Sequence, residues 1–454
     1  MFVDLEKIEI LDGFLCFNPY FLILALIVLL HFFYSWHRSY TRTGWKLDVW
    51  HLSLFLSYIL PCVIMYPFFS SEMNALSTGS AYVRIGQYVE EAFFISLIGY
   101  ISILMGKVFY DGKQHCYKDF GLLGNIVVTN IRRGAMMYIW SILCIVFFAV
   151  AFYISLSSGM LFNGRGWFLT HPSYRFIANF MVGIYTLCFL YLGARLLTGI
   201  GTVWDKALLI IFPFCSIMWG SRSVLFGSLF LLFCYWYYLH PSVSLKKIFF
   251  VGVGFVICVM LLGVLRGSGG VNESSSMSLL IAFFNIFYGN TFSDGRDFAW
   301  MLSGFDGDFQ LGKTYISGIF SFLPSDLFSW RREYAMGVYT LDLAGISNDS
   351  GEHPGLRGGL FYELFFNFSY PGVILGGVFI GYLLACADRG MRYFIGNEKD
   401  IIKGYVMGLP YLLLVNSLST AGMFKVYIII GFHLLTLFCN AFLFPRSVPK
   451  SPSS

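Results

Sequence analysis

Residues 134–157 read GAMMYIWSILCIVFFAVAFYISLS, a run without a charged side chain that can cross a hydrocarbon core of roughly 30 Å as a helix. Of the 454 residues in the chain, 57% are hydrophobic and only 12% are charged. A soluble domain of this length could not stay in solution with that composition. The sequence therefore predicts an integral membrane protein.

Further apolar runs bring the number of predicted transmembrane helices to about eleven. They lie near 18–36, 49–69, 89–110, 175–198, 204–219, 221–240, 247–265, 370–387, 404–419 and 425–444, and Pro410 interrupts the run at 404–419. The predicted fold is an all-α polytopic membrane protein. It comprises eight helices over residues 1–265, one large loop over 266–369 between the eighth and ninth spans, and three helices with a tail over 370–454.

Basic residues predict the orientation, because Lys and Arg are retained on the cytoplasmic side during insertion. They gather in alternate short loops, near residues 38–46, 113–133, 246–247 and 389–403. The N-terminus is acidic, and we place it with the 266–369 loop on the outer face and the C-terminus in the cytoplasm. No cleavable signal is expected, because the first apolar run is long and lacks a small-residue cleavage site.

Within the large loop, Met277 to Tyr288 is apolar but too short to span, so we expect it to lie in the interface or to re-enter the membrane. From Gly359 onward, the sequence GLFYELFFNFSYPG is predicted to be helical and to continue into the next span. Glu363 and Asn367 then share one helix face. The ten cysteines lie in apolar segments or, for Cys116, in a cytoplasmic loop, so no cysteine metal site is expected.

Two arginines lie at the ends of predicted spans. Arg222 occupies the outward turn Trp219-Gly-Ser-Arg-Ser223, where free backbone N–H groups at a helix start favour an anion such as phosphate. The alternative is an arginine that reaches toward lipid headgroups. Arg266 ends a span and is followed by Gly267, so a helix C-cap explains it well, although it faces the large loop.

Two charged clusters lie inside the loop. Arg296 sits between Asp294 and Asp297, which predicts either a solvated set of local ion pairs or a sugar or phosphate contact with a carboxylate as base. Arg357, bracketed by glycines, precedes Glu363, and a glutamate near the bilayer has to be paired, hydrated or functional. This second cluster is the strongest in the chain, and its alternative is a structural Arg357–Glu363 pair that fastens the loop to the helices.

Other patterns in the sequence are weaker evidence for a functional site. Asp306-Gly-Asp308 resembles an acidic metal motif, but we expect a turn there, and His353 has no neighbouring ligand. Gly377 and Gly381 lie inside a span, where small residues serve helix packing. No metal or cofactor is predicted. The net charge of +5 comes mainly from basic residues in the predicted cytoplasmic loops, so it gives no reason to expect nucleic acid as a partner.

Four features together resemble the bacterial O-antigen polymerases of the Wzy type. They are the span count, the single large outer loop late in the chain, the Gly-Ser-Arg turn at 220–222, and the Arg-Gly-Gly segment at 357–359 that leads into Glu363, Asn367, Phe368 and Gly372. Where the family has a glycine soon after Asn-Phe, this chain has Ser369-Tyr370-Pro371. The resemblance implies a multi-pass protein of the bacterial inner membrane, with a periplasmic loop and N-terminus.

The resemblance also implies an activity. The enzyme would transfer a growing glycan from undecaprenyl pyrophosphate to a hydroxyl of a second lipid-linked oligosaccharide repeat unit, at the membrane lipid surface. Arg222, Arg266, Arg296 and Arg357 are the candidate pyrophosphate ligands, and Glu363, Asp294 and Arg357 are the candidate catalytic residues. A polysaccharide chain-length regulator is an expected partner. The alternatives are a flippase for the same lipid-linked units, or an O-antigen ligase or another lipid-dependent glycosyltransferase.

Overall fold

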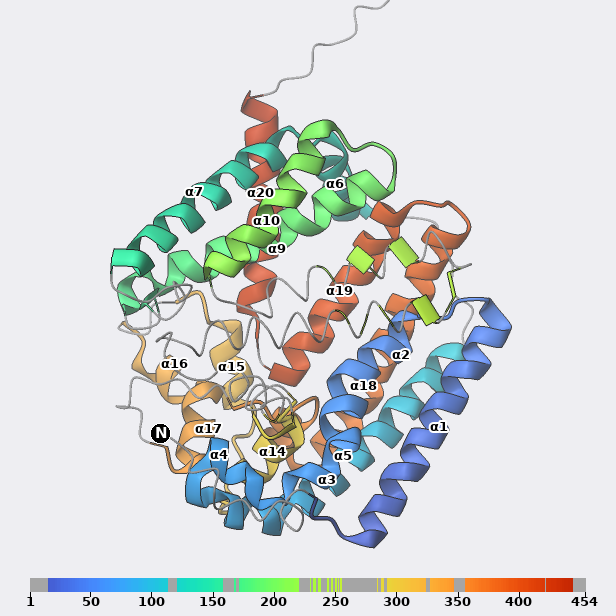
Figure 1. The fold of residues 1–454 in the computed structure, drawn as a ribbon, viewed down its shortest axis with the longest axis vertical. Coiled ribbons are helices and arrows are strands. Elements are labelled where there is room, and N and C mark those ends of the chain that lie inside the picture. The colour runs from blue at the N-terminus through green and yellow to red at the C-terminus, as the bar shows by residue number, and fades with distance from the viewer. Residues whose placement is uncertain are drawn as a thin grey trace, which may run out of the picture. The chain divides into compact units, whose positions relative to one another are not determined.

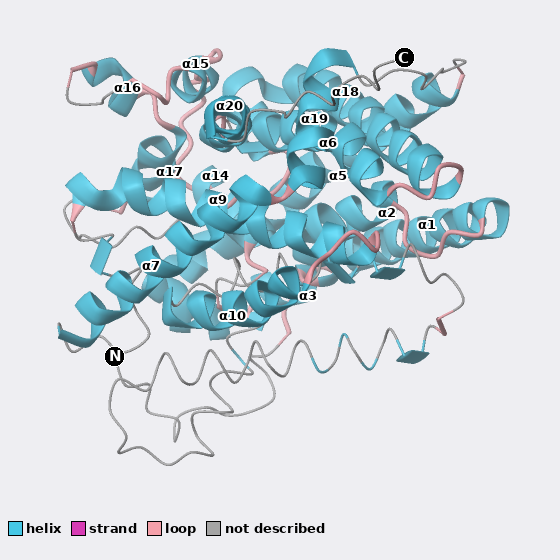
Figure 2. Ribbon diagram, turned by 90° about the horizontal axis from the view of Figure 1, so that it is seen from above, coloured by secondary structure: helices cyan, strands magenta, loops and turns pink. Residues whose placement is uncertain are grey.

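The computed structural model describes residues 15–112, 121–157, 167–168, 171–219, 292–323, 327–346, 356–420 and 422–443, and scattered positions between 229 and 289. Every regular element within these residues is a helix (Figures 1 and 2). The chain forms two compact units. Unit 1 comprises Met1–His115, Gly270–Arg389 and Gly408–Phe424, and unit 2 comprises Cys116–Gly269, Gly390–Met407 and Lys425–Ser454.

Six of the described helices are long and apolar enough to cross a membrane. They are Pro19–Thr43, Gly79–Asp111, Ala135–Ser157, Ile177–Leu197, Tyr362–Gly396 and Ile401–Thr420. Shorter apolar helices cover Val49–Ile64 and Phe424–Asn440. The prediction of an all-helical membrane protein is thus confirmed. The spans predicted near 221–240 and 247–265 fall almost wholly outside the described residues, so the count of eleven and the loop's location stay predictions.

Unit 1 begins with α1 (Pro19–Thr43), whose N-terminus is capped when the Asn18 side chain accepts a hydrogen bond from the Tyr20 N–H. Next come α2 (Val49–Leu54) and a π-helix, η2 (Phe55–Ile64), that contains Pro61. Since proline has no N–H to donate, the regular ladder cannot continue through Pro61. The single span predicted over 49–69 is therefore a series of short helices that ends with α3 (Tyr66–Phe69).

Glycines let two long helices of unit 1, α5 (Tyr82–Asp111) and α18 (Tyr362–Gly396), approach closely. A Cβ added to Gly377 would lie 2.8 Å from the Ser102 Cβ, and one added to Gly381 would collide with the carbonyl of Ile103. Small residues at such crossings allow backbone contact between membrane helices. The prediction that Gly377 and Gly381 serve helix packing is confirmed.

A sharp bend divides α18. Ser369 has φ 56° and ψ −155°, outside the helical region, and Pro371 follows it. A Cβ added to Gly376 would lie 2.6 Å from the Leu364 side chain, although twelve residues of straight helix would separate them by about 18 Å. The helix predicted to run from Gly359 into the span therefore exists, but residues 362–368 fold back against residues 370–376.

Four short helices of unit 1 fall within the predicted loop: α14 (Asp294–Leu302), α15 (Lys313–Ile319), α16 (Ser329–Glu333) and α17 (Met336–Ala344). α14 packs against α5 and α17, and its Phe298, Ala299 and Met301 are fully buried. The expected turn at Asp306-Gly-Asp308 is confirmed, because the Asp308 N–H donates to Asp306 Oδ1 at 3.1 Å. This part of the chain is therefore packed onto the long helices.

Unit 2 contains α6 (Gly121–Arg133), α7 (Ala135–Ser157), α9 (Pro172–Leu197), α10 (Val203–Trp219) and α20 (Phe424–Leu443). Its buried cation, Arg195, lies 3.4 Å from Asp205 and donates to the carbonyls of Ile131 and Arg132 at the end of α6. A cation at a helix C-terminus is favoured by the helix dipole. Arg195 therefore ties three helices together.

Candidate functional site

The N-terminus of α14 carries two carboxylates, Asp294 and Asp297, where negative charge is favoured by the helix dipole. Ser293 Oγ donates to Asp297 Oδ2 at 2.8 Å, and the Asp297 N–H donates to the Ser293 carbonyl at 2.7 Å. These contacts fix the first turn of the helix. The position of the Asp297 carboxylate is therefore defined.

Arg296 is enclosed in the same turn, with only 1% of its surface exposed. Its Nε and Nη2 donate to Asp297 Oδ1 at 3.1 and 2.8 Å, and its Nη1 donates to Ser77 Oγ at 2.7 Å and to the Tyr288 carbonyl at 2.8 Å. The predicted local ion pair is present, but it is buried rather than solvated. A pyrophosphate contact at Arg296 would require the guanidinium to exchange these partners.

Arg357, in contrast, has an exposed side chain. Its backbone N–H donates to Asp297 Oδ2 at 3.3 Å, so Asp297 connects the Arg357 segment to the start of α14. Two residues on, Gly359 has a φ of 78°, and a Cβ added there would lie 3.4 Å from the Asp294 Cβ. The turn after Arg357 therefore requires glycine and passes directly beside Asp294.

Asp294 is half-buried, and burial raises its pKa from 3.8 to about 7. The Arg357 guanidinium lowers this pKa and the Asp297 carboxylate raises it, and both effects are smaller than that of burial. A carboxyl group with such a pKa can take up and release a proton near neutral pH. Asp294 and Arg357 thus provide a proton acceptor beside an exposed cation.

Glu363 lies in the first turn of α18 and is completely buried. Thr314 Oγ1 of α15 donates to Glu363 Oε1 at 2.6 Å, and Asn367 Nδ2 donates to Thr314 Oγ1 at 2.7 Å. The other carboxyl oxygen, Oε2, has no hydrogen-bond partner among the described residues. Within that part of the chain, Glu363 is thus bonded to Thr314 and does not form the pair with Arg357 that was one of the predicted alternatives.

Tyr362 lies between the two carboxyl groups along the chain. It is 6% exposed, and a Cβ added to Gly358 would lie 2.3 Å from its ring, while the next residue, Gly359, passes beside Asp294. The start of α18 therefore gathers the cluster around Asp294 and the cluster around Glu363 into one site. We call this set of residues, Asp294, Arg357, Tyr362 and Glu363, the carboxylate site.

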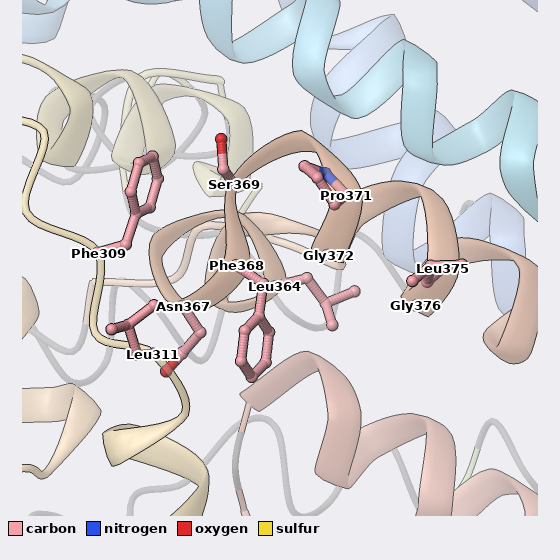
Figure 3. Close-up of a pocket in the computed structure, with 10 residues that line it drawn as sticks. All are labelled: Phe309, Leu311, Leu364, Asn367, Phe368, Ser369, Pro371, Gly372, Leu375 and Gly376. Atoms are coloured by element: carbon pink, nitrogen blue, oxygen red, sulfur yellow. The ribbon is translucent and has the colours of Figure 1, made fainter.

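The bend of α18 also borders a cavity of about 560 Å³ (Figure 3). Phe309 and Leu311 line it from the segment before α15, and residues of α18 on both sides of the bend, among them Phe368 and Leu375, complete the lining. We call this cavity the bend groove. Its polar side chains are Asn367, which also belongs to the Thr314–Glu363 network, and Ser369.

The polar backbone at the bend is satisfied by the segment before α15. Pro371 has no N–H for the Asn367 carbonyl, which instead accepts from the Leu311 N–H at 3.0 Å. The Phe366 carbonyl accepts from the Gln310 N–H at 2.9 Å, and Asn367 Oδ1 accepts from the Gly312 N–H at 2.9 Å. The bend is therefore stable because groups of the segment before α15 replace the hydrogen bonds that the helix lacks there.

The structure brings Asp294, Arg357 and Glu363 into one region and places Arg296 in a supporting contact. Arg222, Arg266 and His353 lie outside the described residues. Within the described ranges, no group of three or more His, Cys, Asp or Glu residues could hold a metal ion.

Sequence reasoning missed the positions of Thr314, Tyr362 and Asp297 in this site. Thr314 lies 49 residues before Glu363, and a lone threonine carries no signal of such a contact. Tyr362 resembled the many other aromatic residues of the apolar segments. Asp297 was visible as part of a charged cluster, but its bond to the Arg357 backbone depends on the path of the chain between them.

The fold defines the class of this protein as an all-helical membrane protein with a carboxylate site at the start of a bent helix. No family model matches the chain, and comparisons with curated proteins and with solved structures also find no match.

Proposed function

We propose that this protein is a polymerase that joins undecaprenyl-pyrophosphate-linked oligosaccharide repeat units into O-antigen polysaccharide on the periplasmic face of the bacterial inner membrane. One observation carries the proposal: the exposed Arg357 lies beside the Asp294 carboxyl group where an apolar, membrane-length helix begins. A cation for a leaving pyrophosphate and an acceptor for a proton are the groups that this transfer needs. The resemblance of the 357–372 segment to this family agrees with it.

In the proposed reaction, an acceptor sugar hydroxyl attacks the anomeric carbon of the donor glycan. A new carbon–oxygen bond forms as the bond between that carbon and the pyrophosphate oxygen breaks, and undecaprenyl pyrophosphate leaves with the electron pair. The hydroxyl proton passes to a carboxylate. Arg357 stabilises the growing negative charge through charge-assisted hydrogen bonds, a role in which Arg222 and Arg266 would also serve.

We assign the proton acceptor to Asp294 because it is partly accessible and lies beside Arg357. Glu363 is enclosed and bonded to Thr314, so it acts as a positioning residue that holds the start of α18 against α15. Arg296 acts likewise through Asp297, whose other oxygen accepts from the Arg357 backbone. The site thus contains two reacting groups held by two buried networks.

The test is a deletion strain complemented with the wild type, Arg357→Ala or Arg332→Ala, with glycan length read on a gel and protein abundance measured in membranes. Arg332 is the control because it is another exposed arginine of unit 1, in α16. A polymerase deletion retains core with a single repeat unit, a ligase deletion has core alone, and a flippase deletion also fails to display the unit.

We expect the wild type and Arg332→Ala to restore the ladder. Arg357→Ala at equal abundance should lower the polymerisation rate by about 10²- to 10³-fold, the usual effect of removing one group that stabilises developing charge. An unchanged ladder in the deletion strain would exclude the polymerase. Equal activity of the two arginine variants would remove Arg357 from the site.

A further inference from the structure

The bend groove is lined by exposed apolar side chains of α18 and of the segment before α15. Its lining residues Leu375 and Leu311 are 72% and 76% exposed, and Phe368 is 43% exposed. On a helix that is long and apolar enough to span a bilayer, exposed apolar side chains contact hydrocarbon rather than water. The ligand group that fits this groove is therefore a hydrocarbon chain.

The walls of the groove are held by close helix packing and by backbone hydrogen bonds. A Cβ added to Gly372 would lie 2.5 Å from the Phe368 Cβ, so only glycine lets the two arms of α18 fold together at this point. On the opposite side, the backbone hydrogen bonds from Gln310 and Leu311 hold the preceding segment against the bend. A preformed cavity of about 560 Å³ lies within the range of roughly 300–1,000 Å³ that is usual for specific ligand sites.

One side of the groove leads to the carboxylate site. Asn367 lines the groove and donates to Thr314, and Thr314 donates to Glu363, so two hydrogen bonds separate the groove from the buried carboxyl group. An amphiphile with its chain in the groove and its polar head toward Asn367 would place that head at the hydrogen-bond network that holds the start of α18.

We infer that the bend groove binds the polyprenyl chain of the lipid-linked glycan, an inference that rests on the proposed polymerase function. Phe309 and Phe368 both line the groove (Figure 3), and aromatic rings offer apolar surface to a chain with repeated methyl branches and double bonds. Binding of the chain holds the pyrophosphate head near Arg357. Part of the substrate's binding free energy then serves to orient the reacting bond.

The test is photocrosslinking of the purified full-length protein in phosphatidylglycerol nanodiscs, with a polyprenyl phosphate that carries a diazirine on its chain. Labelled peptides are mapped by mass spectrometry. We expect labels within residues 309–311 and 364–376, and we expect excess undecaprenyl phosphate to remove them while added dioleoyl phosphatidylglycerol does not.

Leu375→Trp should fill the groove and lower the labelling about tenfold, because the indole occupies space in which the polyprenyl chain would otherwise make apolar contacts. Ile374→Trp is the matched control, since Ile374 is the neighbouring residue, is 41% exposed and does not line the groove. Leu311→Trp gives an independent variant from the opposite wall. Both groove variants replace exposed side chains, so we expect normal folding, checked by thermal unfolding.

Absence of labels from these two segments would overturn the inference, as would equal competition by phospholipid or equal labelling of Leu375→Trp and Ile374→Trp. The deletion-strain ladder is read separately. Labelling of the groove together with an unchanged ladder would reject the polymerase and leave a polyprenyl-binding site. A ladder that collapses to one repeat unit without any groove labelling would reject the groove and leave the polymerase.

Discussion

Thr314→Val tests whether the Thr314–Glu363 network holds the start of α18. The Thr314 hydroxyl is 1% exposed, donates to Glu363 Oε1 at 2.6 Å and accepts from Asn367 Nδ2 at 2.7 Å. Valine keeps the shape and removes both hydrogen bonds. Since Glu363 Oε2 has no partner among the described residues, the substitution would leave the whole carboxyl group unsatisfied.

The expected loss of stability is about 3 kcal/mol, because a buried hydrogen bond contributes roughly 0.5–1.5 kcal/mol and a buried unsatisfied group costs a further 1–3 kcal/mol. Hydrogen bonds between membrane helices average only about 0.6 kcal/mol, since the partners find replacements. Among the described residues, Thr314 is the one donor to the Glu363 carboxyl group, so the larger value applies.

Stability is measured by SDS titration of the purified protein in mixed micelles, followed by circular dichroism. Thr340→Val is the matched control, because Thr340 is 2% exposed and its hydroxyl donates only within its own helix, to the Gly337 carbonyl at 3.2 Å. We expect the control to lose less than about 1 kcal/mol.

A double-mutant cycle makes the assignment specific. In the Glu363→Leu background, Thr314→Val should cost only about 1 kcal/mol, which corresponds to a coupling of about 2 kcal/mol between the two side chains. Equal losses for Thr314→Val and Thr340→Val would refute the reasoning. Additive effects in the cycle would show that Thr314 and Glu363 do not act on each other.

Three further predictions concern the neighbouring residues. Burial raises the pKa of Asp294 to about 7, so the folded state binds the carboxyl proton more strongly than the unfolded state does. The stabilisation of the folded state by this proton is therefore full below pH 3.8 and is lost as the pH rises to about 7. Asp294→Asn should therefore stabilise the protein more at pH 8 than at pH 5 in thermal unfolding, and the opposite order would contradict the raised pKa. Ser369→Gly should stabilise the protein by about 1 kcal/mol. Glycine relieves roughly 1–3 kcal/mol of backbone strain at φ 56°, but its greater conformational entropy in the unfolded chain offsets part of this gain. Ser369→Ala, which keeps the strain, should leave the unfolding midpoint unchanged. Arg296→Met should destabilise the protein by about 3–5 kcal/mol, because it leaves the buried Asp297 charge without its partner. Arg357→Met, at an exposed position, should change the stability by no more than about 0.5 kcal/mol. Similar unfolding midpoints for the two variants would show that Arg296 is not structural.

Ser369 shows how a local sequence signal and a tertiary consequence combine. Pro371 interrupts the helical hydrogen-bond ladder, and Ser369, two residues before it, adopts a backbone conformation that glycine favours. The sequence therefore marked an unusual position. It could not show that the helix folds back there, because the bend also requires the backbone of residues 310–312 to satisfy the exposed carbonyls.

The sequence could not distinguish the buried arginine of the site, Arg296, from the exposed one, Arg357. Arg296 and Arg357 both lie in short, charged, glycine-containing segments, and both were candidate pyrophosphate ligands. The structure buries Arg296 at 1% exposure and leaves Arg357 exposed. Burial depends on Ser77 and Tyr288, which approach Arg296 from other segments, so no local pattern distinguishes the two residues.

Three features were predictable from the amino-acid sequence: the membrane class of the protein, the helix that carries Glu363 and Asn367, and the packing role of Gly377 and Gly381. Each of these follows from hydropathy, helical periodicity or residue size along a continuous stretch of chain. Three other features became visible in the folded chain alone: Thr314 contacts Glu363, Asp294 lies beside Gly359, and a groove forms where α18 bends. These contacts join segments whose separation in the chain leaves no periodic trace, since they depend on how the intervening helices pack.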